Sequence, residues 1–243
     1  SEPSLIAHLD RYVITEDVQL HGRSAECGEI FVTGPDAAQT LTAIGLNGES
    51  LGLYDHAAGA VGEAMVWMRR VDWLGQPGFL LASLADHLPT LWTGVVDAGA
   101  RPAGGAAFHP LRIESGFPLY SLDISEDNLA QEAARTEQAI SFTKGCYLGQ
   151  EPIARIDALG HVNRELRGLK LAVDTVPPPG SRVIDLENAK DVGTVTSSAM
   201  SPVDRRPVAL AYLKSQFTAP GTLVSVIVEG EPIGATVFWP MQG

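Results

Sequence analysis

The last third of the chain consists of short apolar runs that turn signals separate at regular intervals. Proline and glycine clusters stand between the runs, for example at residues 177–180 and 219–222. The runs occupy residues 169–173, 182–184, 192–196, 208–213 and 223–228. This spacing is typical of antiparallel strands joined by tight turns. We therefore predict a small C-terminal antiparallel β-barrel, or a sandwich, over residues 166–243, as a domain separate from residues 1–165.

The first 165 residues show mixed periodicity. Apolar residues recur at helical spacing over residues 5–12, 37–44 and 88–98. Extended or alternating runs occupy residues 13–20, 29–36, 63–69 and 78–83. Asp36 precedes the second helix, where a carboxylate can cap the first amide groups. No GxGxxG or P-loop pattern accompanies the strands, so the pattern indicates an α+β fold without a nucleotide cradle.

The charge balance limits the partners. The chain has 29 acidic and 17 basic residues, which gives a formal net charge of -12. This charge repels phosphate backbones and anionic lipids, so we expect no direct nucleic-acid partner and no membrane partner. Cys27 and Cys146 match no disulfide framework and no paired metal-ligand spacing. Without an apolar run of the roughly 20 residues that a membrane helix needs, the composition favours a cytoplasmic protein.

The segment KGCYLGQE at residues 144–151 concentrates unusual residues. Gly145 and Gly149 permit backbone conformations that are closed to other residues, which predicts a structured loop. Lys144 gives Cys146 a positive neighbour that favours the reactive thiolate. The alternative is that Cys146 is an apolar core residue, because free cysteines are often buried.

Two carboxylates in the middle of the chain also suggest chemistry. Glu114 and Glu132 could act as a paired acid and base, or accept bonds from an N-H-rich ring such as a pterin. They could equally be solvated, or paired with Arg112, Arg135 or Arg155. The six histidines show no HxH or HxxxH spacing, so we expect no metal site.

The string KGCYLGQE, followed by PIARI at residues 152–156 and GHVNR at residues 160–164, resembles the signature of YgfZ-type folate-binding proteins. Segments 9–18, 111–116, 128–133 and 192–197 support the resemblance in the same order. That family is related to the T-protein (aminomethyltransferase) of the glycine cleavage system. The resemblance implies T-protein-like folate-binding α/β layers, here N-terminally incomplete, followed by the small β-barrel.

The resemblance also implies a site. Glu114 matches the glutamate that holds the pterin ring, while Tyr120, Asp123 and Arg164 match residues that line or close that site. Cys146 and Lys144 match the reactive pair of the YgfZ type. We expect tetrahydrofolate, or another reduced folate, as the cofactor. The residues expected to bind it are Glu114, Tyr120, Asp123, Glu132, Gln150, Glu151, Arg155 and Arg164.

Family members usually carry a further segment before the helix at residues 5–12, which contains strands of the folate-binding core. Its absence should leave an open sheet edge and apolar surface. We therefore expect this chain to need that N-terminal segment of the same protein as a partner for folding and for folate binding.

Three functions follow from these observations. The first is a folate-binding accessory protein for the assembly or repair of iron-sulfur cluster enzymes, including tRNA-modifying ones, with iron-sulfur proteins or assembly factors as partners. The second is a tetrahydrofolate-dependent aminomethyltransferase of the glycine cleavage type. The third is a folate-binding interaction module that catalyses nothing. The cysteine loop favours the first, because aminomethyl transfer does not require a cysteine between glycines.

Overall fold

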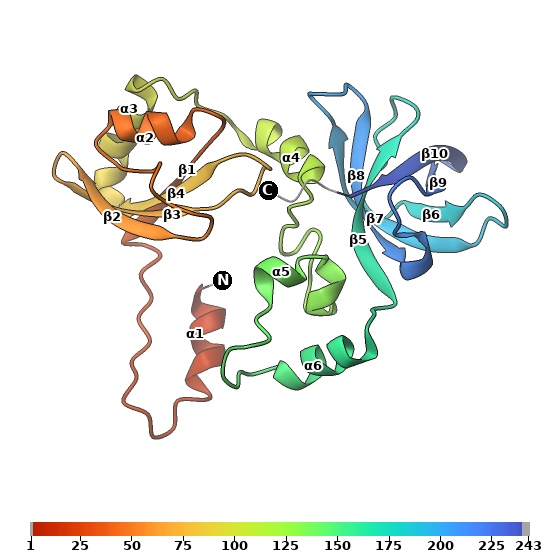
Figure 1. The fold of residues 1–243 in the computed structure, drawn as a ribbon, viewed down its shortest axis with the longest axis horizontal. Helices are drawn as coiled ribbons and strands as arrows, with labels where there is room; N and C mark the ends of the chain where they lie inside the picture. Colours follow the sequence, from red (N-terminus) through yellow and green to blue (C-terminus); the bar gives the residue numbers. More distant parts are fainter. Residues whose placement is uncertain (1, 240–243) are drawn as a thin grey trace. The chain divides into compact units, whose positions relative to one another are not determined.

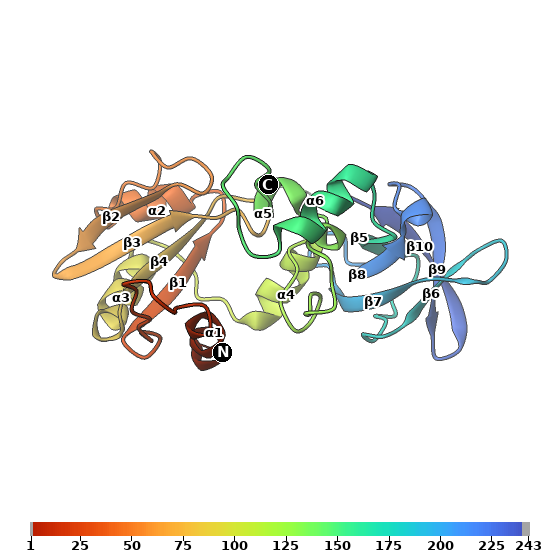
Figure 2. The same cartoon turned by 90° about the horizontal axis from the view of Figure 1, so that it is seen from below.

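The computed structural model describes residues 2–239, and the chain forms two compact units. The first unit ends at Pro102 and the second begins at Ala103. Figure 1 shows the helices and strands of both units, and Figure 2 shows them from a second side. None of the helices in the described residues is long and apolar enough to cross a membrane.

The first unit is a four-stranded antiparallel sheet with two helices on one face (Figure 1). The strands lie in the order β1-β4-β3-β2. Their bounds are Cys27–Thr33 for β1, His56–Val61 for β2, Ala64–Arg70 for β3 and Gly78–Leu84 for β4. The helices are α2 (Ala37–Ala43) and α3 (Leu88–Asp97), and α1 (Glu2–Asp10) and the short η1 (Ala85–His87) complete the unit.

Side-chain alternation explains the core of this sheet. In β3, Ala64, Val66 and Met68 are buried, while Met65 and Trp67 between them are exposed. The buried residues of β3 and β4 pack against Leu41 of α2 and against α3 in one apolar cluster. Period-two alternation of this kind places one face of a strand in the core and the other face away from it.

Most of the predicted elements of the first unit are confirmed, with three exceptions. Residues 13–20 form no strand, and their apolar side chains Ile14 and Val18 are exposed. The strand β2 was not predicted, because its small residues give a weak alternation. Asp36 occupies the N-cap position but makes no side-chain capping bond, since its φ of -99° and ψ of 10° lie outside the extended region that capping uses.

The second unit contains the predicted antiparallel barrel, and it is closed. Its strands follow the order β10-β5-β8-β7-β6-β9. Their bounds are Arg164–Leu171 for β5, Arg182–Asp185 for β6, Asp191–Met200 for β7, Pro207–Lys214 for β8, Leu223–Val228 for β9 and Glu231–Phe238 for β10. The short η3 (Ser215–Phe217) follows β8. Because β10 pairs with both β5 and β9, the barrel leaves no open edge.

A second apolar cluster lies outside the barrel, under helix α4 (Gly105–Glu114). Ile113 of α4 packs there against Leu210 and Tyr212 of β8. The short η2 (Ala130–Ala133), α5 (Thr136–Ala139) and α6 (Gln150–Leu159) follow α4 in the chain. Residues 103–163 therefore form one compact unit with the barrel, whereas the predicted division into residues 1–165 and 166–243 follows the change in secondary structure.

Helix α4 also carries one member of a buried ion pair. Arg112 and Asp123 have fully buried side chains, and the Nη1 of Arg112 donates to the Oδ2 of Asp123 at 2.7 Å. Arg112 also donates to the Ser197 hydroxyl at 2.7 Å and to the carbonyl of Phe117 at 3.1 Å. Its Nε donates to the Nδ1 of His109, and burial together with the charge of Arg112 lowers the pKa of His109. Removal of either charge would leave the other buried without its partner.

We predict that Asp123→Asn destabilises the protein by about 3 to 5 kcal/mol, because it leaves the buried guanidinium of Arg112 uncompensated. The free energy of unfolding from denaturant titration measures this loss. The matched control is Asp191→Asn, which breaks the exposed pair of Arg182 with Asp191. That variant should cost less than about 1 kcal/mol. Equal losses in the two variants would contradict the central role of the Arg112 pair.

Candidate functional site

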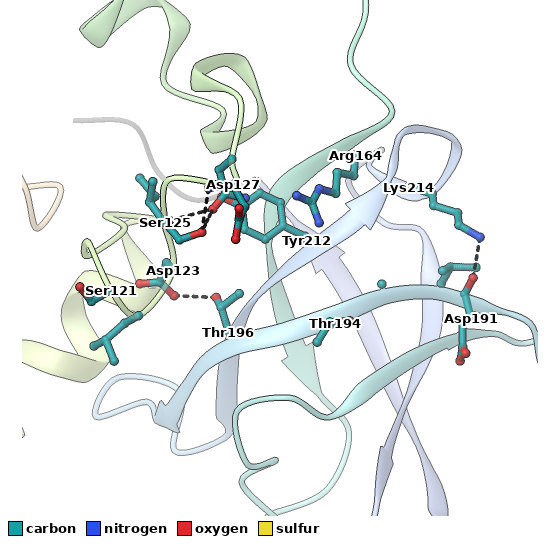
Figure 3. A pocket seen from close by; sticks show the side chains of 15 residues that line it. Ser121, Asp123, Ser125, Asp127, Arg164, Asp191, Thr194, Thr196, Tyr212 and Lys214 are labelled. Carbon is teal, nitrogen blue, oxygen red and sulfur yellow. Dashed lines mark hydrogen bonds between the residues drawn. The ribbon is translucent and has the colours of Figure 1, made fainter.

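A cavity of about 610 Å³ lies in the second unit, beside the outer face of the barrel (Figure 3). The segment 121–128 forms one side, and strands β5, β7 and β8 contribute the other. Charged and hydroxyl side chains dominate the lining. The residues are Ser121, Leu122, Asp123, Ile124, Ser125, Asp127, Asn128, Arg164, Asp191, Val192, Gly193, Thr194, Thr196, Tyr212 and Lys214.

Asp123 fixes the segment to the barrel. Its Oδ2 accepts from the backbone amide of Leu119 at 2.9 Å, in addition to the bond from Arg112. Its Oδ1 accepts from the hydroxyl of Thr196 on β7 at 2.6 Å. Both oxygens of Asp123 are therefore used inside the protein, which suits it to hold the wall of the cavity.

The next turn is held by its own polar side chains. The Oδ1 of Asn128 accepts from the amide of Ser125 at 2.8 Å, and the hydroxyl of Ser125 accepts from the amide of Asp127 at 3.2 Å. Such side-chain bonds to nearby amides favour turns over helix. They leave the carboxylate of Asp127 on the cavity side, as Figure 3 shows. The short η2 follows this turn, and Leu129 occupies its cap position.

Glu132 is buried and paired with Arg164. The Nε of Arg164 donates to its Oε1 at 3.0 Å. Its Oε2 accepts weakly from the amide of Leu129 at 3.3 Å and from the side chain of Asn128 at 3.4 Å. The hydrogen bond that Arg164 donates to Glu132 raises the pKa of Arg164. A salt bridge was one of the open alternatives for Glu132, but its partner is Arg164, which was not among the arginines considered.

Tyr212 forms part of the cavity wall and has an unusual hydroxyl. The residue is 7% exposed, and no described residue bonds its buried hydroxyl. The guanidinium of Arg164 lies over its ring, 5.1 Å from the centroid. Burial, reinforced by the charge of Glu132, raises the pKa of Tyr212 to about 12. Its hydroxyl therefore remains protonated at neutral pH and can donate a hydrogen bond.

Glu114 and Tyr120 lie outside the lining of this cavity. Glu114 ends helix α4, and its Oε1 accepts from the hydroxyl of Ser201. The same Ser201 oxygen accepts from the amides of Val203 and Asp204, so Glu114 joins α4 to the turn between β7 and β8. Tyr120 is 67% exposed. Pterin binding by either residue stays a prediction.

The cysteine segment is an irregular loop that leads into α6, and Cys146 is exposed, which excludes the alternative of a core residue. The amide of Lys144 donates to the hydroxyl of Ser141 at 3.2 Å. The ammonium of Lys144 lies 4.2 Å from the centroid of the Tyr147 ring. Gly149 has a φ of +86°, a conformation that favours glycine, and it stands immediately before α6.

Helix α6 carries Gln150, Glu151 and Arg155, and the latter two are exposed. None of the three lines the cavity, and neither do Cys146 and Lys144. Of the predicted site residues, the cavity thus brings together Asp123 and Arg164, with Glu132 bonded to Arg164. Within residues 2–239, no three histidine, cysteine, aspartate or glutamate side chains are grouped so that they could hold a metal ion.

The sequence analysis missed Tyr212, Lys214, Thr194 and Thr196. Alternation along β8 places Tyr212 and Lys214 on the same face, which is a signal that the sequence contains. The register of the barrel is needed to add the others. Thr194 pairs with Tyr212, and Arg164 pairs with Lys214.

Two models of protein families match this chain, and both describe domains of the glycine cleavage T-protein. Residues 1–144 match the GCVT N-terminal domain, and residues 164–241 match the glycine cleavage T-protein C-terminal barrel domain. The fold resembles the crystal structure of glycine cleavage system aminomethyltransferase T from Bartonella henselae. The TM-score is 0.83 at 24% identity, over 98% of this chain and 65% of that one.

Curated relatives agree with these matches. The aminomethyltransferase of Saccharopolyspora erythraea is 32% identical over 216 residues, which cover 86% of this chain and 58% of the relative. That of Picosynechococcus is 29% identical over 231 residues, which cover 94% of this chain and 63% of the relative. The chain therefore spans less than two thirds of the length of either relative.

We predict that Tyr212 makes stability fall at alkaline pH. A free tyrosine has a pKa of 10.0 and the folded Tyr212 about 12, so the contribution is complete below pH 10 and is lost between these values. The loss amounts to about 2 to 3 kcal/mol, since one pKa unit corresponds to about 1.4 kcal/mol. Unfolding free energies measured across this range, with tyrosinate absorbance as a second readout, test it.

The control is Tyr212→Phe, which removes the tyrosine that titrates at about pH 12. In this variant the unfolding free energy should fall less steeply between pH 10 and pH 12. A slope that persists in this variant would assign the effect to other groups.

Proposed function

Because the chain belongs to the glycine cleavage T-protein family, we propose that it binds a reduced folate such as tetrahydrofolate. Two observations support this proposal. Both domain matches are to T-protein domains, and together they include most of the chain. The segments around Glu114 and Glu132 also resemble those of folate-binding members. A folate is the cofactor that this resemblance implies.

We further propose that the protein uses Cys146 to support iron-sulfur cluster enzymes. The observation that carries this proposal is the exposed thiol in its glycine-flanked loop. A Cβ added at Gly145, the residue before Cys146, would meet no atom within 4 Å, so the space beside Gly145 is open. Exposed cysteines with a positive neighbour are the ones that react or ligate metals. Thiolates bind iron and accept sulfur, which is the chemistry that cluster assembly or repair requires.

The loop lies between the two matched domains. Residues 145–163, which contain Cys146 and α6, fall outside both domain matches, while the fold likeness to the aminomethyltransferase structure covers 98% of this chain. The exposed thiol itself is therefore what supports a role for Cys146.

Aminomethyl transfer is the second candidate, and the names of the curated relatives favour it. Transfer of a one-carbon unit to tetrahydrofolate uses a carboxylate at the reacting nitrogen. In the second unit, Asp123 and Glu132 are occupied by Arg112 and Arg164. Glu114 has one oxygen bonded by Ser201 and the other without a described partner. The two candidates differ in their need for Cys146.

We predict that Glu114→Gln weakens tetrahydrofolate binding by about 2 kcal/mol, roughly 30-fold, because one acceptor becomes a donor at a charge-assisted bond. Calorimetric titration of the protein with tetrahydrofolate measures the change. The control is Ser201→Ala, which removes the internal partner of Glu114 and leaves the carboxylate intact. An unchanged affinity in Glu114→Gln would remove Glu114 from the folate site.

We predict that Cys146→Ser abolishes the support of iron-sulfur enzymes in cells that lack the native protein. The side chain is exposed, so the unfolding free energy should change by less than about 0.5 kcal/mol. Tetrahydrofolate affinity should also be unchanged, since the thiol is not expected to contact folate. Complementation, calorimetry and thermal unfolding of the same variant give the three readouts.

The control for this variant is Cys27→Ser on β1, which should complement fully. Complementation by Cys146→Ser, together with aminomethyl transfer from a carrier-bound amine, would favour the second candidate. Complementation without any transfer activity would favour a folate-binding interaction module.

A further inference from the structure

Two positive side chains lie opposite each other on the outer face of the barrel. Arg164 on β5 and Lys214 on β8 are directly paired in the antiparallel register. Like charges at opposed positions destabilise a sheet, so the placement has a cost in the free protein. Both side chains line the same cavity. Figure 3 shows the guanidinium of Arg164 turned toward Tyr212 and the ammonium of Lys214 turned toward Asp191, so an anionic group at Arg164 would also be attracted by the charge of Lys214.

The contacts that Arg164 and Lys214 make within the protein leave hydrogen-bond donors on both side chains. Glu132 accepts from the Nε of Arg164, and no described residue accepts from its two terminal nitrogens. Those two nitrogens form a planar fork that suits a carboxylate. The Nζ of Lys214 donates to the backbone carbonyl of Asp191 at 2.7 Å, which is a neutral acceptor. The carboxylate of Asp191 is itself paired with Arg182 at 2.8 Å.

The facing segment contributes a negative charge without a cation of its own. Within residues 2–239, Asp127 forms no salt bridge, and its carboxylate lies on the cavity side (Figure 3). Its charge is close enough to Arg164 to contribute to the raised pKa of that arginine. The cavity therefore presents cations from the strands and an anion from the loop.

A third polar group lies between these charges. The hydroxyl of Tyr212 is buried, protonated and without a described partner, and the ring points toward Asp127 and Ser125 (Figure 3). Buried polar groups are almost always bonded, and an orphaned one indicates a missing partner. An incoming polar atom would satisfy this hydroxyl.

We infer that this cavity binds a small zwitterion of the α-amino acid class. Its carboxylate binds the terminal nitrogens of Arg164, within the positive field of Lys214, its ammonium group contacts Asp127, and the Tyr212 hydroxyl bonds a polar atom of the ligand. A simple anion would suit the site less well, because the Asp127 carboxylate would repel it. The volume of about 610 Å³ leaves space for an amino-acid side chain beside Leu122 and Ile124.

This inference is independent of the function proposed for Cys146. The cavity lies wholly in the second unit, and neither Cys146 nor Glu114 lines it. Of the residues predicted to bind folate, Asp123 and Arg164 line the cavity, and the carboxylate of Asp123 is already bonded by Arg112 and Thr196. The test therefore relies on Lys214, Asp127 and Tyr212.

The experiment is calorimetric titration of the protein with the standard amino acids. The best-binding amino acid is then compared with its decarboxylated amine and its deaminated acid. Because each lost group removes a charge-assisted bond, we expect each analogue to bind about tenfold more weakly or worse. Lys214→Gln and Asp127→Asn should each weaken the amino acid about tenfold, and Tyr212→Phe several-fold.

The matched control is Lys170→Gln, which removes another exposed barrel lysine that pairs with a carboxylate, Asp204. It should leave amino-acid binding unchanged. Tyr212→Phe also reports on folding, because loss of an unpaired hydroxyl should leave the melting temperature of the ligand-free protein equal or higher. Weak binding in that variant then cannot be attributed to unfolding.

Three results would overturn the inference. One is that no amino acid binds. Another is that the deaminated acid binds as tightly as the amino acid, which would make the cavity an anion site. The third is that Lys214→Gln and Asp127→Asn leave amino-acid binding unchanged. Titration of the Lys214→Gln variant with tetrahydrofolate separates the two proposals, because this variant should keep its affinity for folate. A loss of folate affinity would assign the cavity to the folate site and overturn this inference.

Discussion

The buried ion pair between Arg112 and Asp123 is the interaction on which the arrangement of the second unit depends. Arg112 is the largest fully buried side chain described, and it lies between helix α4 and the barrel. Asp123 neutralises it and bonds Thr196 on β7 as well. A charge of this kind is retained only where its partners are fixed, because desolvation penalises any loosened geometry. The pair thus makes the position of segment 121–128 on the barrel a condition of stability.

The cavity follows from this constraint. With Asp123 held against β7, the turn formed by Ser125 and Asn128 must lie over the outer face of β8, where Tyr212 is buried. The same outer face of the barrel carries Arg164 on β5 and Lys214 on β8. An apolar group that covered them would bury their charges without a partner, which is energetically costly. The segment and the strands therefore remain separated there and leave the cavity between them. The groups that are bonded within the protein hold the site together, and the groups without an internal partner are the ones available to a ligand.

The barrel could be predicted from the sequence because its strands alternate with strong turn signals, and β8 shows why the prediction had limits. The run from Pro207 to Lys214 is apolar at nearly every position, since one face fills the barrel and the other packs under α4. A continuous apolar run predicts that the strand is buried, but it does not tell which elements pack against its two faces. Strand β10 was missed because Pro232 and Gly234 weaken its pattern, while its role depends on pairing with the distant β5.

The candidate site shows the same division between local and long-range information. The loop around Cys146 was predicted from Gly145 and Gly149, which is a local signal. The pairing of Glu132 with Arg164 joins residues 32 positions apart, and composition could not choose this arginine over Arg112, Arg135 or Arg155. Asp123 was expected to bind folate, and its role in this structure is to hold Arg112. Motif resemblance identifies residues that matter without distinguishing a structural role from a binding role.

The second unit therefore separates two kinds of chemistry. The cavity depends on charges whose positions the barrel register and a buried ion pair determine. The loop of Cys146 lies outside the matched domains, and the few side-chain contacts described for it are a hydroxyl bond and the stacking of Lys144 on Tyr147. A thiol in an open loop can meet a large partner, because no wall limits the size of what approaches it. A walled cavity with fixed charges suits a small molecule. The same compact unit thus contains a cavity of a size that suits a small ligand and an exposed thiol that a protein could approach, and the two share no residues.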